Sequence, residues 1–117
     1  MKRDNDYIRQ LLFEMEASEG YGFDASKGFS NRVAIKRVYH MELLCDAGLA
    51  KDLNHGFHRL TNAGHDFLDA MRDEGVWQRT KDTIATAGGN ATLDILKQIA
   101  LGYLKTQIKE KTGVELK

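Results

Sequence analysis

The 117-residue sequence has no proline, a single cysteine and no long apolar run, and each absence excludes a class of protein. One cysteine, Cys45, cannot form an intrachain disulfide, which excludes a disulfide-stabilised secreted domain and favours a cytoplasmic protein. No apolar run approaches the roughly 20 residues that a membrane-spanning helix needs. The charged start, Met1-Lys2-Arg3-Asp4, precedes no apolar segment, so no signal peptide is expected. Because proline is absent, the 11 glycines provide most of the chain breaks, and helices should dominate.

Neither sign of charge is in excess, since 17 basic residues balance 17 acidic ones. A net charge of zero weakens a DNA-binding interpretation, because phosphate neutralisation supplies most of the non-specific affinity for DNA. The distribution matters more than the sum. Residues 25–41 contain four basic side chains and no acid, namely Lys27, Arg32, Lys36 and Arg37. We expect these cations to lie side by side on an exposed surface; the alternative is an ordinary solvated helix face.

Hydrophobic spacing predicts helices over residues 4–17 and 31–48, with a very short strand near residues 21–23 between them. Ser30 is a suitable N-cap for the second helix. That segment fits either one continuous helix or two short helices with a tight turn near Lys36, and a helix-turn-helix requires two. The first helix has one apolar stripe, formed by Ile8, Leu11, Leu12 and Met15.

Two short strands, residues 49–53 and 57–60, surround Asn54-His55-Gly56, which suits a tight hairpin. Three more helices are expected, the first capped by Thr61, over residues 62–74, 76–87 and 92–111. A helix followed at once by a hairpin is typical of a winged helix-turn-helix. We therefore predict a mainly α fold with a small β-hairpin: a winged-helix domain over residues 1–75 and a C-terminal helical extension over residues 76–117.

The last helix has a broader apolar surface than packing against a small domain requires, which favours a homodimer. The alternative is a terminal helix that folds back over the first helix. The expected dimer interface comprises Leu93, Leu96, Ile99, Ala100, Tyr103, Leu104 and Ile108.

The leading functional interpretation is DNA binding by a transcriptional regulator, with the Lys36-to-Tyr39 end of the helix in the major groove and the hairpin on the adjacent backbone. Arginine and asparagine can bind guanine and adenine edges, and lysine can bind phosphate. A dimer would contact two half-sites about one helical turn apart. The candidate DNA-binding residues are Lys27, Asn31, Arg32, Lys36, Arg37, Tyr39, His55, His58 and Arg59.

Other chemistry is weakly indicated, so we expect no enzymatic activity, no cofactor and no bound metal. A structural zinc site usually needs four ligands with paired cysteines, whereas His55 and His58 have only Cys45, His40 or His65 to join them. Cys45 on an apolar helix is more typical of packing than of a nucleophile. The carboxylates Asp66, Asp69 and Asp73 share one helix face, most simply a solvated one.

A second class of function is a protein-interaction module that binds a phage or host protein and no DNA. The balanced charge and the short hairpin favour it, with the acidic face of residues 66–74 or the C-terminal helix as the docking surface. The basic segment favours DNA. The two interpretations differ in the expected dependence of DNA affinity on salt.

Two motifs resemble a known family. Residues 39–49, YHMELLCDAGL, fit the pattern YHxxLLxxAGL of winged-helix repressors. Residues 59–77, RLTNAGHDFLDAMRDEGVW, with the start MKRD, resemble the phage-associated bacterial family known as domain of unknown function 2513, whose pattern is close to RLTxxGHxFLDxxRxxxVW. Where that family often has Trp-Glu, this chain has Asn62-Ala63. The resemblance implies a small cytoplasmic winged-helix protein of bacteria, phages or prophages, and implies no chemistry.

Overall fold

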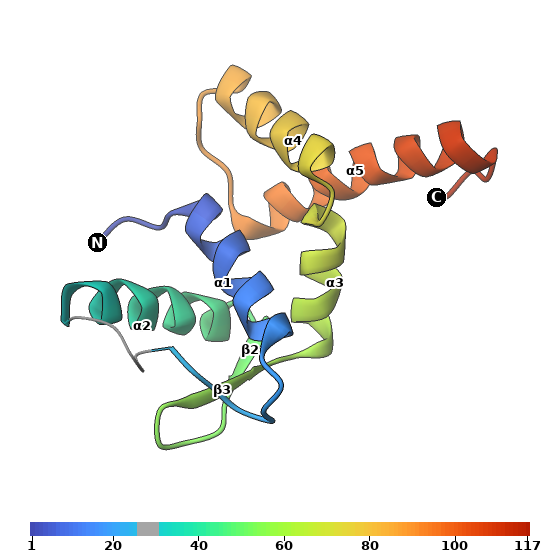
Figure 1. The fold of residues 1–117 in the computed structure, drawn as a ribbon. Helices are drawn as coiled ribbons and strands as arrows, with labels where there is room; N and C mark the ends of the chain where they lie inside the picture. The colour runs from blue at the N-terminus through green and yellow to red at the C-terminus, as the bar shows by residue number, and fades with distance from the viewer. Residues whose placement is uncertain (26–30) are drawn as a thin grey trace. The chain divides into compact units, whose positions relative to one another are not determined.

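The computed structural model describes residues 1–25 and 31–117, which form two compact units, Met1–Leu68 and Asp69–Lys117. The boundary between the two units falls within a helix, whereas the sequence pattern favours a boundary between residues 75 and 76. The elements in chain order are α1 (Asn5–Ala17), β1 (Phe23–Asp24), α2 (Asn31–Asp46), β2 (Ala50–Asp52), β3 (Phe57–Leu60), α3 (Asn62–Met71), α4 (Glu74–Thr86) and α5 (Leu93–Thr112) (Figure 1). The chain is thus mainly helical with one small sheet, as predicted.

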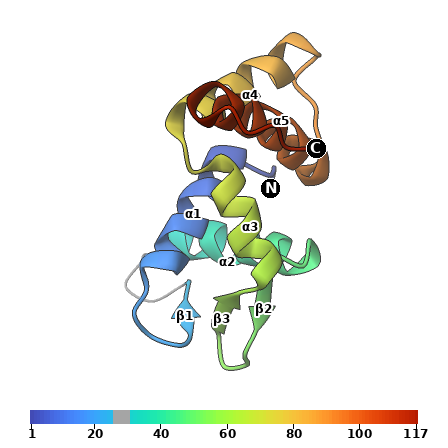
Figure 2. The same ribbon diagram turned by 90° about the vertical axis from the view of Figure 1, so that its right-hand side faces the viewer.

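The first unit places α1 against both α2 and a three-stranded antiparallel sheet. The strand order is β1-β3-β2, so β3 lies in the middle (Figure 2). Phe23 of β1 pairs with His58 of β3, and Ala50 of β2 pairs with Leu60 of β3. The predicted stripe of α1 is confirmed, because all four of its side chains are buried: Ile8, Leu11, Leu12 and Met15.

Residues 31–46 form one continuous helix, so the alternative with a turn near Lys36 is wrong. The expected N-cap Ser30 lies outside the described residues. At its other end, α2 is followed by Gly48, whose positive φ of 76° lets the Leu49 N–H return to the Leu44 carbonyl at 2.8 Å. This is a common way to end a helix, and it directs the chain into β2.

His40 fastens α2 to the start of α1. Its ring is fully buried, and its Nδ1–H donates to the Lys36 carbonyl of the preceding turn at 2.8 Å. Its Nε2 accepts the Asp4 backbone N–H at 3.0 Å. Since Nε2 is an acceptor here, the geometry requires the neutral Nδ1–H tautomer. His40 is therefore a fully satisfied core residue.

The hairpin leads directly into the third helix, α3. Asn54, His55 and Gly56 at its tip all have positive φ, which the residue types predict for the asparagine and the glycine. After β3, the Thr61 hydroxyl accepts the Gly64 N–H at 3.0 Å and donates to the Gly48 carbonyl at 2.6 Å. Thr61 is therefore the predicted cap of α3.

In the second unit, α4 packs along α5 (Figures 1 and 2). Trp77, Thr80 and Ile84 of α4 are buried, so Trp77 is a core residue. Thr80 satisfies its hydroxyl by donating to the Val76 carbonyl at 2.7 Å. Within the described ranges, none of the helices combines the length and apolar character that crossing a bilayer requires.

A substitution at Gly64 tests the packing of α3 on the hairpin. A Cβ atom at this position would collide with the backbone carbonyl of Leu49, which cannot rotate away as a side chain can. We expect Gly64→Ala to lower the free energy of unfolding by about 2 kcal/mol. Gly102→Ala is the matched control, because its Cβ would enter open space on α5, and the gain in helix propensity should make it neutral or stabilising. Urea unfolding of both variants measures the difference; equal effects would contradict this packing.

Candidate functional site

Arg37 is buried, which contradicts the expectation that it lies on an exposed basic surface. Only 5% of the residue is exposed. Its Nε donates to the Ala25 carbonyl at 2.6 Å, and its Nη1 donates to the Glu14 carboxylate at 2.8 Å. The guanidinium therefore links α2 to α1 and to the residue that follows β1, and it cannot contact DNA in this arrangement.

The phase of α2 explains the burial of Arg37. Met41 and Leu44 follow it at intervals of four and three residues, and both are fully buried against the core. Arg37 lies in the same row, one turn closer to the N-terminus. Helical spacing in the sequence therefore already indicated that Arg37 faces the core. The expectation failed because arginine is usually a surface residue, and its partner Glu14 is distant in the sequence.

Lys36 is also engaged by α1. Its ammonium nitrogen lies 3.4 Å from an Asp4 carboxylate oxygen and 4.4 Å from the centre of the Tyr7 ring. The side chain remains half-exposed, but the carboxylate balances its charge. The expectation of four cations side by side on an exposed surface is therefore wrong for Arg37, and Lys36 is half-exposed but paired with a carboxylate. Arg32 is exposed, and Lys27 lies outside the described residues.

The remaining candidate DNA contacts are scattered. Tyr39 is half-buried with its ring edge-on to His40, 5.6 Å between centroids. His55 is exposed at the hairpin tip. His58 is half-buried, and its Nδ1 has no hydrogen-bond partner among the described residues. Arg59 donates to the Leu60 carbonyl at 3.0 Å. Of the nine candidates, Asn31 and Arg32 are the two exposed on α2.

The outward face of α2 is aliphatic at its centre. Ile35 is 59% exposed and Val38 is 39% exposed, and the two aliphatic side chains lie one helical turn apart on the same face of α2. Together with Ala34 and Tyr39 they line a shallow, open hollow that ends at Asn31 and Glu42. We call this set the α2 outer face: Asn31, Ala34, Ile35, Val38, Tyr39 and Glu42. Sequence reasoning missed this face, because the interpretation of the segment rested on its cations and not on the aliphatic residues between them.

The charges on α2 are separated along its length. Arg32 is exposed in the first turn, and Glu42 and Asp46 are exposed near the C-terminal end. Within residues 1–25 and 31–117, no ion pair holds any of these three side chains. The α2 outer face thus has an aliphatic centre and ends at the acidic Glu42, while the basic Arg32 flanks its other end, next to Asn31.

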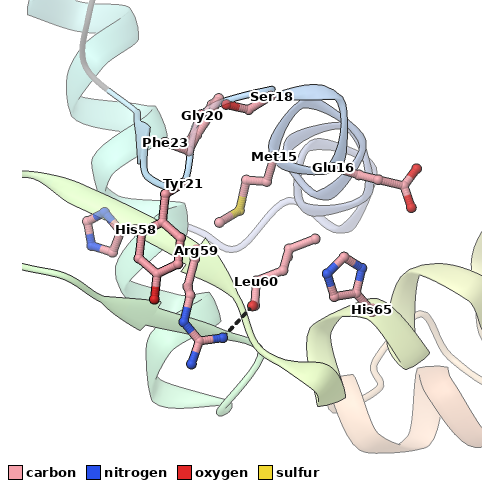
Figure 3. Close-up of a pocket in the computed structure, with 10 residues that line it drawn as sticks. All are labelled: Met15, Glu16, Ser18, Gly20, Tyr21, Phe23, His58, Arg59, Leu60 and His65. Carbon is pink, nitrogen blue, oxygen red and sulfur yellow. Dashed lines mark hydrogen bonds between the residues drawn. The ribbon is translucent and has the colours of Figure 1, made fainter.

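A second hollow lies beside the hairpin, with a volume of about 280 Å³. Met15 and Leu60 point toward each other inside it, and His58 and His65 lie on opposite sides (Figure 3). This volume is at the lower limit of pockets that bind small molecules. Because the two imidazoles do not converge, the hollow offers no shared metal position; among the described residues no cluster of three or more metal-binding side chains occurs.

The acidic side chains expected to share one face are partly used within the chain. Asp69 forms an ion pair with Arg72 at 2.9 Å. Asp73 caps α4. Hydrogen bonds from the Val76 N–H, the larger cause, and from the Gln107 side chain lower the pKa of its carboxyl group. Asp66 is exposed. The three carboxylates therefore have separate environments.

The expected dimer interface on α5 needs correction at two positions. Leu96 and Ala100 are fully buried within the chain, so neither is available to a partner. Tyr103 is half-buried and hydrogen-bonded to Thr83 of α4. The reason is that α4 already covers part of the apolar surface of α5. The other four residues of that set are partly exposed: Leu93, Ile99, Leu104 and Ile108.

Cys45 has the properties of a packing residue. Burial, together with the negative charges of Asp52, Asp46 and Glu42, raises the pKa of its thiol. A raised thiol pKa means less thiolate near pH 7, and thiolate is the reactive form. We expect iodoacetamide to alkylate Cys45 several-fold more slowly in the native protein than in the urea-unfolded protein, as followed by mass spectrometry. A faster reaction in the native state would indicate an activated nucleophile.

Arg37 and Arg32 form a matched pair for testing the two environments. Arg37→Ala leaves a buried carbonyl and a carboxylate without their donor, so we expect it to lower the free energy of unfolding by about 2 kcal/mol. Arg32→Ala removes an exposed side chain, so its effect should stay within about 0.5 kcal/mol. Thermal or urea unfolding compares them. If Arg37→Ala is as mild as Arg32→Ala, the guanidinium is solvated.

Comparison with known proteins places the chain in a family. Residues 2–90 match the family model described as "Hypothetical protein (DUF2513)". A Haemophilus influenzae protein, named only "Uncharacterized protein", is 34% identical over 109 residues, which cover 86% of this chain and 92% of the relative. No solved structure matches the chain significantly. Because the family model spans most of the chain and includes both motifs noted in the sequence, this chain belongs to the DUF2513 family.

Proposed function

We propose that this protein is a protein-interaction module of the winged-helix type, which binds a bacterial or phage-encoded protein in the cytoplasm and catalyses no reaction. The α2 outer face is the proposed docking surface. The observation that carries this proposal is the exposure of Ile35 and Val38 at the centre of a helix whose cations Lys36 and Arg37 are engaged by α1. An apolar helix face suits a protein surface better than a phosphate backbone.

The arrangement of the first unit supports a winged-helix interpretation. The strand order β1-β3-β2 and the hairpin directly after α2 favour a winged helix with α2 in the position of the recognition helix, but one continuous helix stands where a helix-turn-helix has two. Recognition helices present polar and basic side chains to DNA. Here the same position presents isoleucine and valine, so we propose that the fold is retained while the bound partner is a protein.

Burial of the two aliphatic side chains can supply useful binding free energy although the proposed surface is small. Burying a whole isoleucine or valine side chain contributes about 1.5 to 3 kcal/mol. Since Ile35 and Val38 are about half-exposed, docking would gain on the order of 1 kcal/mol from each. That corresponds to roughly a fivefold to tenfold change in affinity per side chain. A charged substitution at either position adds the cost of burying a carboxylate.

DNA binding is the second candidate, and the exposed side chains Asn31 and Arg32 at the start of α2 favour it. Lys51 on β2 is also exposed and extends the same chemistry to the hairpin. The zero net charge and the engagement of Lys36 and Arg37 weigh against it.

Peptide selection tests the leading proposal without a known partner. The purified protein is used to select binders from a displayed library of helical peptides, and the affinity of each enriched peptide is then measured for three variants. We expect Ile35→Asp and Val38→Asp to weaken binding at least about tenfold. Ile95→Asp is the matched control, because Ile95 is 47% exposed on α5 and its replacement should leave affinity unchanged. Peptides that bind all variants equally would contradict the proposal.

A salt titration with a random DNA duplex tests the second candidate. We expect no saturable binding at about 50 mM salt, because α1 engages two of the cations of α2, Lys36 and Arg37. Tight binding that falls steeply with salt, and with a flatter slope after Arg32→Ala, would instead establish DNA as the partner.

A further inference from the structure

We infer that the partner of the α2 outer face is the same face of a second copy of this chain, with the two α2 helices antiparallel. This inference rests on the proposed function and identifies its partner. It places the self-association surface on α2, whereas the apolar pattern of the sequence favours α5.

The α2 outer face is self-complementary in its apolar part. Asn31, Ile35, Val38 and Glu42 follow one another at intervals of four, three and four residues, so they form one row along the helix. A two-fold axis perpendicular to α2, passing between Ile35 and Val38, sets Ile35 of one copy against Val38 of the other. The two aliphatic centres then cover each other, and Asn31 lies opposite Glu42 of the second copy.

The charges on α2 select the antiparallel direction. The same two-fold axis places Arg32 of each copy beside Glu42 of the other, and these are side chains with no ion pair inside the described part of the chain. A parallel arrangement would set arginine against arginine and glutamate against glutamate. Antiparallel helices also align their dipoles favourably. Charge complementarity and apolar complementarity therefore require the same symmetry.

The size of the surface sets the strength of the association. A helix of 16 residues is about 24 Å long, and one face of it buries less than the ~800 Å² per partner of a standard interface. We therefore expect a dimer that dissociates in the micromolar range and exchanges rapidly with monomer. Such a dimer leaves the α2 outer face accessible to competing peptides.

Charge-reversal variants, measured alone and as an equimolar mixture, test the antiparallel arrangement. Sedimentation of the full chain is followed from about 1 μM to about 1 mM. We expect the wild type to show a concentration-dependent dimer, and Ile35→Asp to abolish it while Ile95→Asp does not. Arg32→Glu and Glu42→Arg should each weaken self-association about tenfold, because every copy then meets its own charge. An equimolar mixture of the two variants should recover association to at least the wild-type level, since like charges no longer face each other across the two-fold axis.

Each outcome has a distinct meaning. Arg32 and Glu42 are exposed, so neither reversal should alter the circular dichroism spectrum or the unfolding midpoint. A wild type that stays monomeric throughout, a dimer insensitive to Ile35→Asp, or a mixture that gains nothing over its components would each overturn the inference. If the chain is monomeric but selected peptides still depend on Ile35, the inference falls and the proposed function stands. If neither self-association nor peptide binding depends on Ile35, both fall.

Discussion

The hydrogen bonds of Arg37 determine what the surface of this protein presents. Its guanidinium is nearly inaccessible to solvent and is shared between the Ala25 carbonyl and the Glu14 carboxylate. A buried charge is tolerated only when it is paired and hydrogen-bonded, so this side chain fixes the rotation of α2 about its axis relative to α1. His40 and Lys36 reinforce the same rotation through Asp4. Given that rotation, Ile35 and Val38 must face outward.

Local patterns in the sequence were sufficient to predict most elements of the fold. The stripe of α1, the hairpin around Asn54 and the cap at Thr61 all follow from spacing and residue type, and the structure has each of them. These features depend on neighbours within a few residues. Patterns of that kind need no knowledge of tertiary contacts.

The candidate site was harder to predict because it depends on contacts between residues that are far apart in the sequence. Nothing near Arg37 in the sequence indicates that Glu14 and Ala25 will accept hydrogen bonds from it. The same holds for α5, where Leu96 and Ala100 were expected at an interface and are buried within the chain. In both cases a correct helix was assigned the wrong exposed face, since burial is decided by the partner element and not by the helix alone.

A double-mutant cycle between Glu14 and Arg37 tests the central claim most directly. The unfolding free energies of Glu14→Gln, Arg37→Gln, the double variant and the wild type give the coupling between the two side chains. The account predicts a favourable coupling of at least about 0.5 kcal/mol, because the pair is formed and largely shielded from solvent. Strictly additive effects would mean that Arg37 does not hold α2 in this rotation, and the aliphatic outer face would lose its structural basis.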